Sequence, residues 1–290
     1  MGAVNPWIVG ARPKTLPAAV VPVAVGLAAA AGSNGNRWWL GVPALVVSLA
    51  LQVGVNYAND YSDGVRGTDE VRVGPLRLVG SGLVAPKKVK AAAFVAFGIA
   101  AVAGLVIALC TSLWLLVVGV AAIAAAWFYT GGKNPYGYIG LGEVFVFVFF
   151  GLVATVGSTF AVSESLPSLS WLASVPVGCL ACALLVVNNL RDIPTDTDAG
   201  KKTLAVRLGD RRTRGSYVLL CVVAAVFVVL AGVQRPSAVL GLVGLAAVAP
   251  GVATVRGGAK GRDLIVVLGT TGRAQMLFGL AFGLGLLIGA

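Results

Sequence analysis

Histidine is absent from this chain of 290 residues. Its absence excludes a Ser-His-Asp triad, a histidine-bound zinc site and a histidine-ligated haem. Cysteine is scarce, and all four cysteines fall within apolar runs: Cys110, Cys179, Cys182 and Cys221. We therefore interpret the Cys179-x2-Cys182 spacing as packing, and not as a redox or zinc pair. Charge is also scarce, at 11% of residues, and the 11 acids are half as numerous as the 22 bases.

Apolar residues dominate the chain. They make up 58% of it, and the mean hydropathy of +0.92 lies far above that of soluble domains. Apolar runs recur at about the 17–25 residues that a helix needs to cross a bilayer. We therefore expect an all-α, multi-pass transmembrane bundle of about nine helices around a central cavity, forming a single domain over residues 1–290. The expected helices are 16–32, 38–61, 88–110, 112–130, 139–162, 168–191, 215–234, 237–255 and 272–289. The first run is interpreted as a span and not as a signal peptide, because Pro17 and Pro22 interrupt it.

The basic residues indicate the orientation of these spans. With the N-terminus inside, 20 of the 22 basic residues fall in inside segments, and only Arg37 and Arg235 fall outside. This distribution follows the positive-inside rule and places the C-terminus outside. The net charge of +11 is thus a signal of topology and of attraction to anionic membrane lipid, and does not predict nucleic-acid binding. We expect the cytoplasmic (inner) cell membrane as the location.

Two acidic clusters of similar design end the second and sixth runs. Asn56, Asp60 and Asp63 follow one another at i, i+4 and i+7, which places their side chains on one face of a helix. Asn188, Asp192 and Asp196 do the same at i, i+4 and i+8 if the helix continues past Pro194. Opposed carboxylates repel one another unless cations lie between them, so the two faces together favour a Mg²⁺ site. An ordinary pair of acidic helix ends is the alternative.

Basic residues follow each cluster and suit a phosphate ligand. Of these we favour Arg66, Arg77 and Lys201, because guanidinium and ammonium groups donate to phosphate oxygens. Lys133, at the inside end of the fourth run, is a further candidate or a membrane-surface anchor. We expect Glu143, at the start of the fifth run, to cap its helix.

The two clusters on about nine helices resemble the UbiA superfamily of intramembrane prenyltransferases. The resemblance covers essentially the whole chain and is carried by Asn59-Asp60-x2-Asp63 and Asp192-x3-Asp196. Further motifs resemble its 1,4-dihydroxy-2-naphthoate polyprenyltransferase branch, which makes a menaquinone precursor: Ala11-Arg12-Pro13-Lys14-Thr15-Leu16-Pro17, Gly74-Pro75-x-Arg77-Leu78-Val79 and Gly200-Lys201-x-Thr203-Leu204.

The resemblance implies a site for Mg²⁺ and the diphosphate of a polyprenyl donor. It implies that Asp60, Asp63, Asp192 and Asp196 bind the metal, with Lys133 as a catalytic diphosphate contact. The residues that it implies to bind substrate are Asn56, Asn59, Arg66, Arg77, Tyr129, Asn188, Lys201, Arg12 and Lys14. The superfamily's third aspartate is replaced here by Gly67, so Asp69 and Asp198 rank second as metal ligands.

The implied reaction is ionisation of the allylic diphosphate, attack by dihydroxynaphthoate, and release of diphosphate and CO2. Other acceptors remain open at this point: 4-hydroxybenzoate, a chlorophyllide, haem or a ribose phosphate. A secondary transporter with an acidic cation site is an alternative of another class. Acids clustered at helix ends on one side, and not at the bilayer midplane, disfavour transport.

Overall fold

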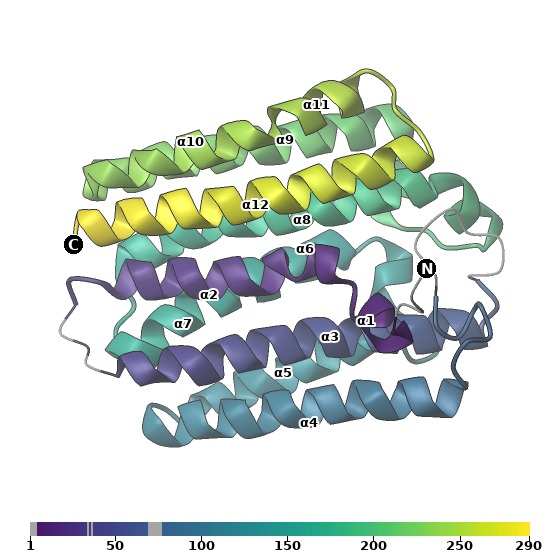
Figure 1. Cartoon of the computed structure of the whole chain (residues 1–290), viewed down its shortest axis with the longest axis horizontal. Coiled ribbons are helices and arrows are strands. Elements are labelled where there is room, and N and C mark those ends of the chain that lie inside the picture. Colours follow the sequence, from purple (N-terminus) through teal and green to yellow (C-terminus); the bar gives the residue numbers. More distant parts are fainter. Residues whose placement is uncertain (1–4, 34, 36, 69–76) are drawn as a thin grey trace.

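The structure, a computed structural model, describes all residues except 1–4, 34, 36 and 69–76. Every regular element in this described part is helical. The long helices lie side by side along the long axis of the molecule (Figure 1). The helical elements, long and short, are in chain order α1 (Pro6–Ala11), η1 (Pro13–Thr15), α2 (Pro17–Ala30), η2 (Trp38–Leu40), α3 (Gly41–Val65), α4 (Pro86–Cys110), α5 (Trp114–Phe128), η3 (Tyr136–Ile139), α6 (Gly142–Val146), η4 (Phe147–Val153), α7 (Ala154–Ser163), α8 (Ser168–Asp198), α9 (Leu204–Gln234), η5 (Pro236–Leu240), α10 (Gly241–Leu245), η6 (Ala246–Val248), α11 (Ala249–Arg256) and α12 (Arg262–Ile288).

The number of helices that could cross a membrane agrees roughly with the nine that the sequence predicts. Within the described residues, seven helices are long and apolar enough to span a bilayer. The bent pair Pro6–Thr15 and Pro17–Ala30 would add an eighth, and Trp114–Phe128 is a further, shorter apolar helix. The chain is therefore a multi-pass membrane protein. Each of the nine helices that the sequence predicts corresponds to one of these segments: the seven long helices, the bent pair and the shorter helix.

Several helices extend beyond the apolar runs from which they were predicted. The second expected helix, 38–61, continues in α3 to Val65, so Asp63 lies on the helix itself. The sixth, 168–191, continues in α8 to Asp198, past Pro194. Hydropathy detects the part of a helix that lies in hydrocarbon, and the backbone hydrogen bonds continue beyond it into polar residues. The matched spacing of the two acidic clusters is thereby confirmed as helical.

Close packing between helices depends on glycine at a few points. The Cα atoms of Gly151 in η4 and Gly178 in α8 approach so closely that a Cβ on Gly151 would lie 2.6 Å from Gly178 Cα. η4 is a turn of π-helix, an insertion that recurs near functional sites. The four cysteines are free thiols, and Cys179 and Cys182 are buried in the interior, as the packing interpretation predicted.

The two ends of the bundle differ in chemistry. Figure 1 shows the C-terminus at one end and α1 toward the other. At the C-terminal end, Arg235 donates to the carbonyl oxygens of Ala31 and Leu286 at 2.8 and 2.6 Å. Toward the opposite end, α3 and α8 bring their polar last turns together, and Asp63 and Lys201 lie 3.3 Å apart there.

Candidate active site

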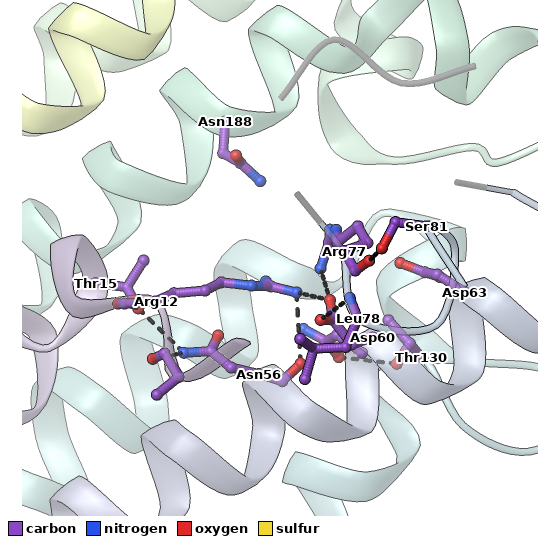
Figure 2. A network of polar contacts seen from close by, with 12 residues as sticks. Arg12, Thr15, Asn56, Asp60, Asp63, Arg77, Leu78, Ser81, Thr130 and Asn188 are labelled. Carbon is purple, nitrogen blue, oxygen red and sulfur yellow. Dashed lines mark hydrogen bonds and ion pairs between the residues drawn. The ribbon is translucent and has the colours of Figure 1, made fainter. Parts of the chain in front are cut away.

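Asp60 is the most enclosed acid of the first cluster, with a side chain only 1% exposed. One carboxylate oxygen accepts from the guanidinium of Arg12 at 2.7 Å and of Arg77 at 2.5 Å. The other oxygen accepts from the backbone N–H of Leu78 at 3.1 Å. Figure 2 shows the two arginines converging on Asp60 from the segment after α1 and from the loop after α3. Asp60 therefore fixes two cations at the end of the bundle.

The asparagines of the first cluster tie α3 to its neighbours. Asn56 donates to the carbonyl oxygen of Ala11 at 2.9 Å, and the backbone oxygen of Asn56 accepts from Arg12 at 3.4 Å. Asn59 accepts from the hydroxyl of Thr130 at 2.8 Å. Both amides are buried. They hold the segments before α2 and after α5 against the acidic turn of α3.

The second cluster contains a cation that the sequence reasoning did not single out. Arg191 in α8 donates to both oxygens of Asp192, at 2.6 and 2.8 Å, and to the side-chain oxygen of Asn188 at 2.7 Å. The Arg191 side chain is 1% exposed. An arginine placed directly beside an aspartate at the end of an apolar run is the signal that could have identified it, because charged groups at membrane depth are paired.

Lys201 and Tyr138 join the two clusters. The Lys201 ammonium lies 3.3 Å from Asp63 and 3.9 Å from Asp196. The Tyr138 hydroxyl donates to the same oxygen of Asp63 at 2.5 Å, and the Lys201 ammonium lies 4.6 Å from the centre of the Tyr138 ring. Burial raises the pKa of Tyr138, and the charge of Asp63 raises it further. Tyr138 was not predicted, because a tyrosine in a short loop carries no distinctive pattern.

A cavity of about 800 Å³ opens between these polar groups and continues among apolar side chains. Its polar end includes most of the predicted site: Arg12, Lys14, Asn56, Asn59, Asp63, Arg77, Tyr129, Asn188, Asp192, Asp196 and Lys201. The remaining lining comes largely from apolar residues of α3, α4, α5, η4 and α7. A cavity of this kind suits a ligand with an anionic head and a long apolar tail.

Other predicted residues lie outside this lining. Asp60 is covered by Arg12 and Arg77. Arg66 is exposed and donates to the carbonyl oxygens of Thr130 and Gly132. Lys133 and Asp198 are exposed, and Asp69 lies outside the described residues. Glu143 lies in the first turn of α6, where the expected cap has no side-chain hydrogen bond; it is half-buried and accepts from Asn189 at 2.9 Å.

The acids of the site have the chemistry of a Mg²⁺ site, although they are not gathered around one point. No group of three or more His, Cys, Asp or Glu side chains in the described part is arranged to bind a metal ion. Asp63, Asp192 and Asp196 nevertheless line one end of the same cavity. Mg²⁺ commonly takes one or two carboxylates and completes its shell with water and phosphate oxygens. The donor set therefore fits Mg²⁺ together with a polyphosphate.

Comparisons with known proteins agree on one family. The model of the UbiA prenyltransferase family matches residues 19–263. The chain is 50% identical, over 97% of its length and 96% of the relative, to the 1,4-dihydroxy-2-naphthoate octaprenyltransferase of Mycobacterium tuberculosis. It is 38% identical to the Escherichia coli protein of the same name, over 74% of this chain and 72% of that one.

Solved structures of low sequence identity share the fold. A UbiA homologue from Aeropyrum pernix superposes with a TM-score of 0.69 at 16% identity, over 99% of both chains. A UbiA homologue from Archaeoglobus fulgidus, bound to GPP and Mg²⁺, superposes with a TM-score of 0.65 at 15% identity, over 98% of this chain and 100% of that one.

Proposed function

This chain belongs to the UbiA prenyltransferase family, and on that premise we propose that it transfers a polyprenyl group from polyprenyl diphosphate to 1,4-dihydroxy-2-naphthoate. The products are demethylmenaquinol, which is the hydroquinone form of demethylmenaquinone, together with diphosphate and CO2. The acceptor is supported by relatives of this name that match at up to 50% identity across the chain. We further propose that residues 1–290 act as one catalytic domain.

Cations and carboxylates at the cavity's end suit the diphosphate of the donor. Arg77 and Lys201 line the cavity and would contact the phosphate oxygens, with Lys133 and Arg66 as outer contacts. Asp63, Asp192 and Asp196 would bind Mg²⁺, and Asp60 would join them when the two substrates draw Arg12 and Arg77 away. Bound Mg²⁺ would neutralise charge that develops on the departing diphosphate. Archaeoglobus fulgidus homologues bound to DMAPP or GPP with Mg²⁺ support this assignment.

The residues around the cavity then control the fate of the ionised donor. The allylic C–O bond breaks and its electron pair leaves with the diphosphate, which Arg77 and Lys201 retain. Apolar walls exclude water from the carbocation. The aromatic ring forms a carbon–carbon bond to the cation, and the carboxylate leaves as CO2 so that its electron pair restores the ring. Arg12 and Lys14 lie at the cavity end where they would orient that carboxylate before it leaves.

We propose that the protein lies in the cytoplasmic membrane with its N-terminus and active-site loops inside and its C-terminus outside. The distribution of 20 of 22 basic residues supports this orientation. Cysteine accessibility tests it in a variant from which the four native cysteines have been removed. A cysteine at Ser81, beside the site, should react with a membrane-impermeant maleimide only after the cells are opened, whereas one at Ala290 should react in intact cells. The reverse pattern would contradict the orientation.

The observation that carries the proposed function is a single cavity with paired carboxylates and cations at one end and apolar walls elsewhere. Purified protein should form prenylated product from dihydroxynaphthoate and a polyprenyl diphosphate when Mg²⁺ is present. Chelation of Mg²⁺ should abolish turnover, and re-addition should restore it. Failure to prenylate this acceptor, with 4-hydroxybenzoate prenylated instead, would reject the proposed acceptor and retain the family chemistry.

A further inference from the structure

Two polar residues of α3 lie deeper in the bundle than the acidic cluster and were not among the predicted site residues. Ser48 and Gln52 precede Asn56 at intervals of four, so the three side chains lie along one face of the helix. All three are buried and line the cavity. The hydroxyl of Ser48 donates to the carbonyl oxygen of Ala19 at 2.7 Å, which accounts for its burial. Gln52 is not accounted for in the same way.

The hydroxyl of Thr15 fixes the orientation of the Gln52 amide. Thr15 Oγ1 donates its one hydrogen to the carbonyl oxygen of Arg12 at 2.9 Å. It lies 3.2 Å from Gln52 Nε2 and 3.2 Å from Asn56 Nδ2, so it must accept from both amides. Both residues therefore present their NH2 groups to Thr15.

The Asn56 amide fixes the same orientation independently. Its Nδ2 donates to the carbonyl oxygen of Ala11 at 2.9 Å, and a carbonyl can only accept. Asn56 Oδ1 is therefore turned toward Gln52, whose Nε2 lies 3.4 Å away. Reversing the Gln52 amide would place two oxygens against each other. The Gln52 NH2 group is committed to Thr15 and Asn56, and Oε1 must point elsewhere.

Gln52 Oε1 receives no hydrogen bond from any residue in the described ranges. The residue as a whole is only 7% exposed, and Oε1 is not among the fully buried atoms that lack a partner, so this acceptor is open to the cavity. Because Gln52 lines the cavity, a ligand that carries a hydrogen-bond donor would satisfy this oxygen. A phosphate group would instead be repelled by it, and a prenyl chain has no donor to offer.

We propose that Gln52 Oε1 accepts a hydrogen bond from the hydroxyl of the aromatic acceptor that is remote from its carboxylate, and so sets acceptor specificity. This inference rests on the proposed function. The hydroxyl next to the carboxylate donates its hydrogen to that carboxylate within the acceptor, so only the remote hydroxyl is free to donate to the protein. Gln52 lies about 6 Å deeper along α3 than Asn56, at 1.5 Å per residue. A ring with its carboxylate near Arg12 spans this separation.

Binding of the acceptor without turnover tests the inference. The dissociation constants of 1,4-dihydroxy-2-naphthoate and of 1-hydroxy-2-naphthoate, which lacks the remote hydroxyl, are measured by naphthalene fluorescence with the full chain. The unchanged protein should bind the diol about tenfold more tightly, the effect of one well-formed hydrogen bond. In Gln52→Met, of similar volume, the two constants should become equal within about twofold.

Two controls separate this role from general damage. Ser48→Ala removes a polar group one turn away and should keep the tenfold preference. Gln52→Leu should behave as Gln52→Met does, with an unchanged KM for the prenyl donor in both. If folded Gln52→Met or Gln52→Leu protein still prefers the diol while turnover of the unchanged protein is normal, the inference is overturned and the proposed function is not. Absence of any naphthoate product with the unchanged protein would instead overturn the proposed function, and this inference with it.

Discussion

The ammonium of Lys201 lies 3.3 Å from the carboxylate of Asp63, although 138 positions separate the two residues in the chain. The Lys201 side chain also lies 3.9 Å from Asp196, which belongs to the second acidic cluster. Both neighbours are at least three-quarters buried. One lysine therefore links the two acidic turns at the point where the diphosphate is proposed to bind.

Replacing Lys201 should impair donor use more than replacing its neighbour. In Lys201→Met we expect kcat/KM for the polyprenyl diphosphate to fall about 100-fold, because a buried charge loses its partner. Lys202→Met is the matched control, since Lys202 is exposed, and it should stay within about twofold. Steady-state kinetics at saturating acceptor measure both. Equal effects of the two substitutions would show that the position of Lys201 between the clusters is unimportant.

Removing the charge of Asp60 should destabilise the protein. Asp60→Asn keeps the shape but leaves two guanidinium groups, Arg12 and Arg77, beside a neutral amide. We expect a loss of about 3 kcal/mol of unfolding free energy, as for a broken buried pair. Asp210→Asn breaks the ion pair between Asp210 and Arg214. Because the Asp210 side chain is 53% exposed, this substitution should cost under about 1 kcal/mol of unfolding free energy. Thermal unfolding in detergent compares them, and equal melting temperatures would contradict this view of Asp60.

Filling the apolar part of the cavity should select against long donors. Gly119 in α5 lines the cavity, and a Cβ built there meets no atom within 4 Å. Gly119→Leu should therefore reduce the ratio of kcat/KM for long to short polyprenyl diphosphates several-fold, because the added side chain occupies space that the chain needs. Gly98→Leu is the control, since Gly98 is equally open but is not part of the lining. If the ratio is unchanged in Gly119→Leu, the prenyl chain of the donor does not occupy this part of the cavity.

The stability of the protein at alkaline pH should distinguish the contribution of the Tyr138 hydroxyl from that of its ring. Burial and then the charge of Asp63 raise the pKa of Tyr138, so the folded state favours the protonated phenol. Its contribution to stability is complete below the unfolded pKa of about 10 and is lost as pH rises above it. Tyr138→Phe keeps the ring beside Lys201, and its melting temperature should fall less than that of the unchanged protein between pH 9 and about pH 11. If the melting temperatures of the two proteins fall in parallel, the loss of stability at alkaline pH comes from groups other than Tyr138.

The sequence was informative about the fold because a bilayer permits few solutions. Apolar length predicted the helices, and four-residue spacing predicted that Asn56 and Asp60 share a face of α3. Helix ends were underestimated where α8 continues past Pro194 to Asp198, because hydropathy does not detect a helix outside hydrocarbon. The π-helical turn at Phe147–Val153 has no sequence signature of its own.

The site was predictable in residue type and less so in partners. Asp63, Asp192 and Asp196 were identified from spacing and do line one cavity. Their contacts to Tyr138 and Arg191 depend on how loops and neighbouring helices meet, which spacing along one helix cannot give. Gln52 was missed because a lone glutamine in an apolar run indicates packing as readily as binding. Its significance comes only from the amide orientation that Thr15 and Asn56 impose.

The most direct measurement is mass spectrometry of the products that the purified protein makes from polyprenyl diphosphate, Mg²⁺ and an equimolar mixture of dihydroxynaphthoate and 4-hydroxybenzoate. We expect a prenylated naphthalene diol that has lost the carboxyl group, with one diphosphate and one CO2 released per product. The same product should be absent with Asp63→Asn. A product that keeps its carboxyl group, or a prenylated benzoate alone, would contradict the proposed reaction.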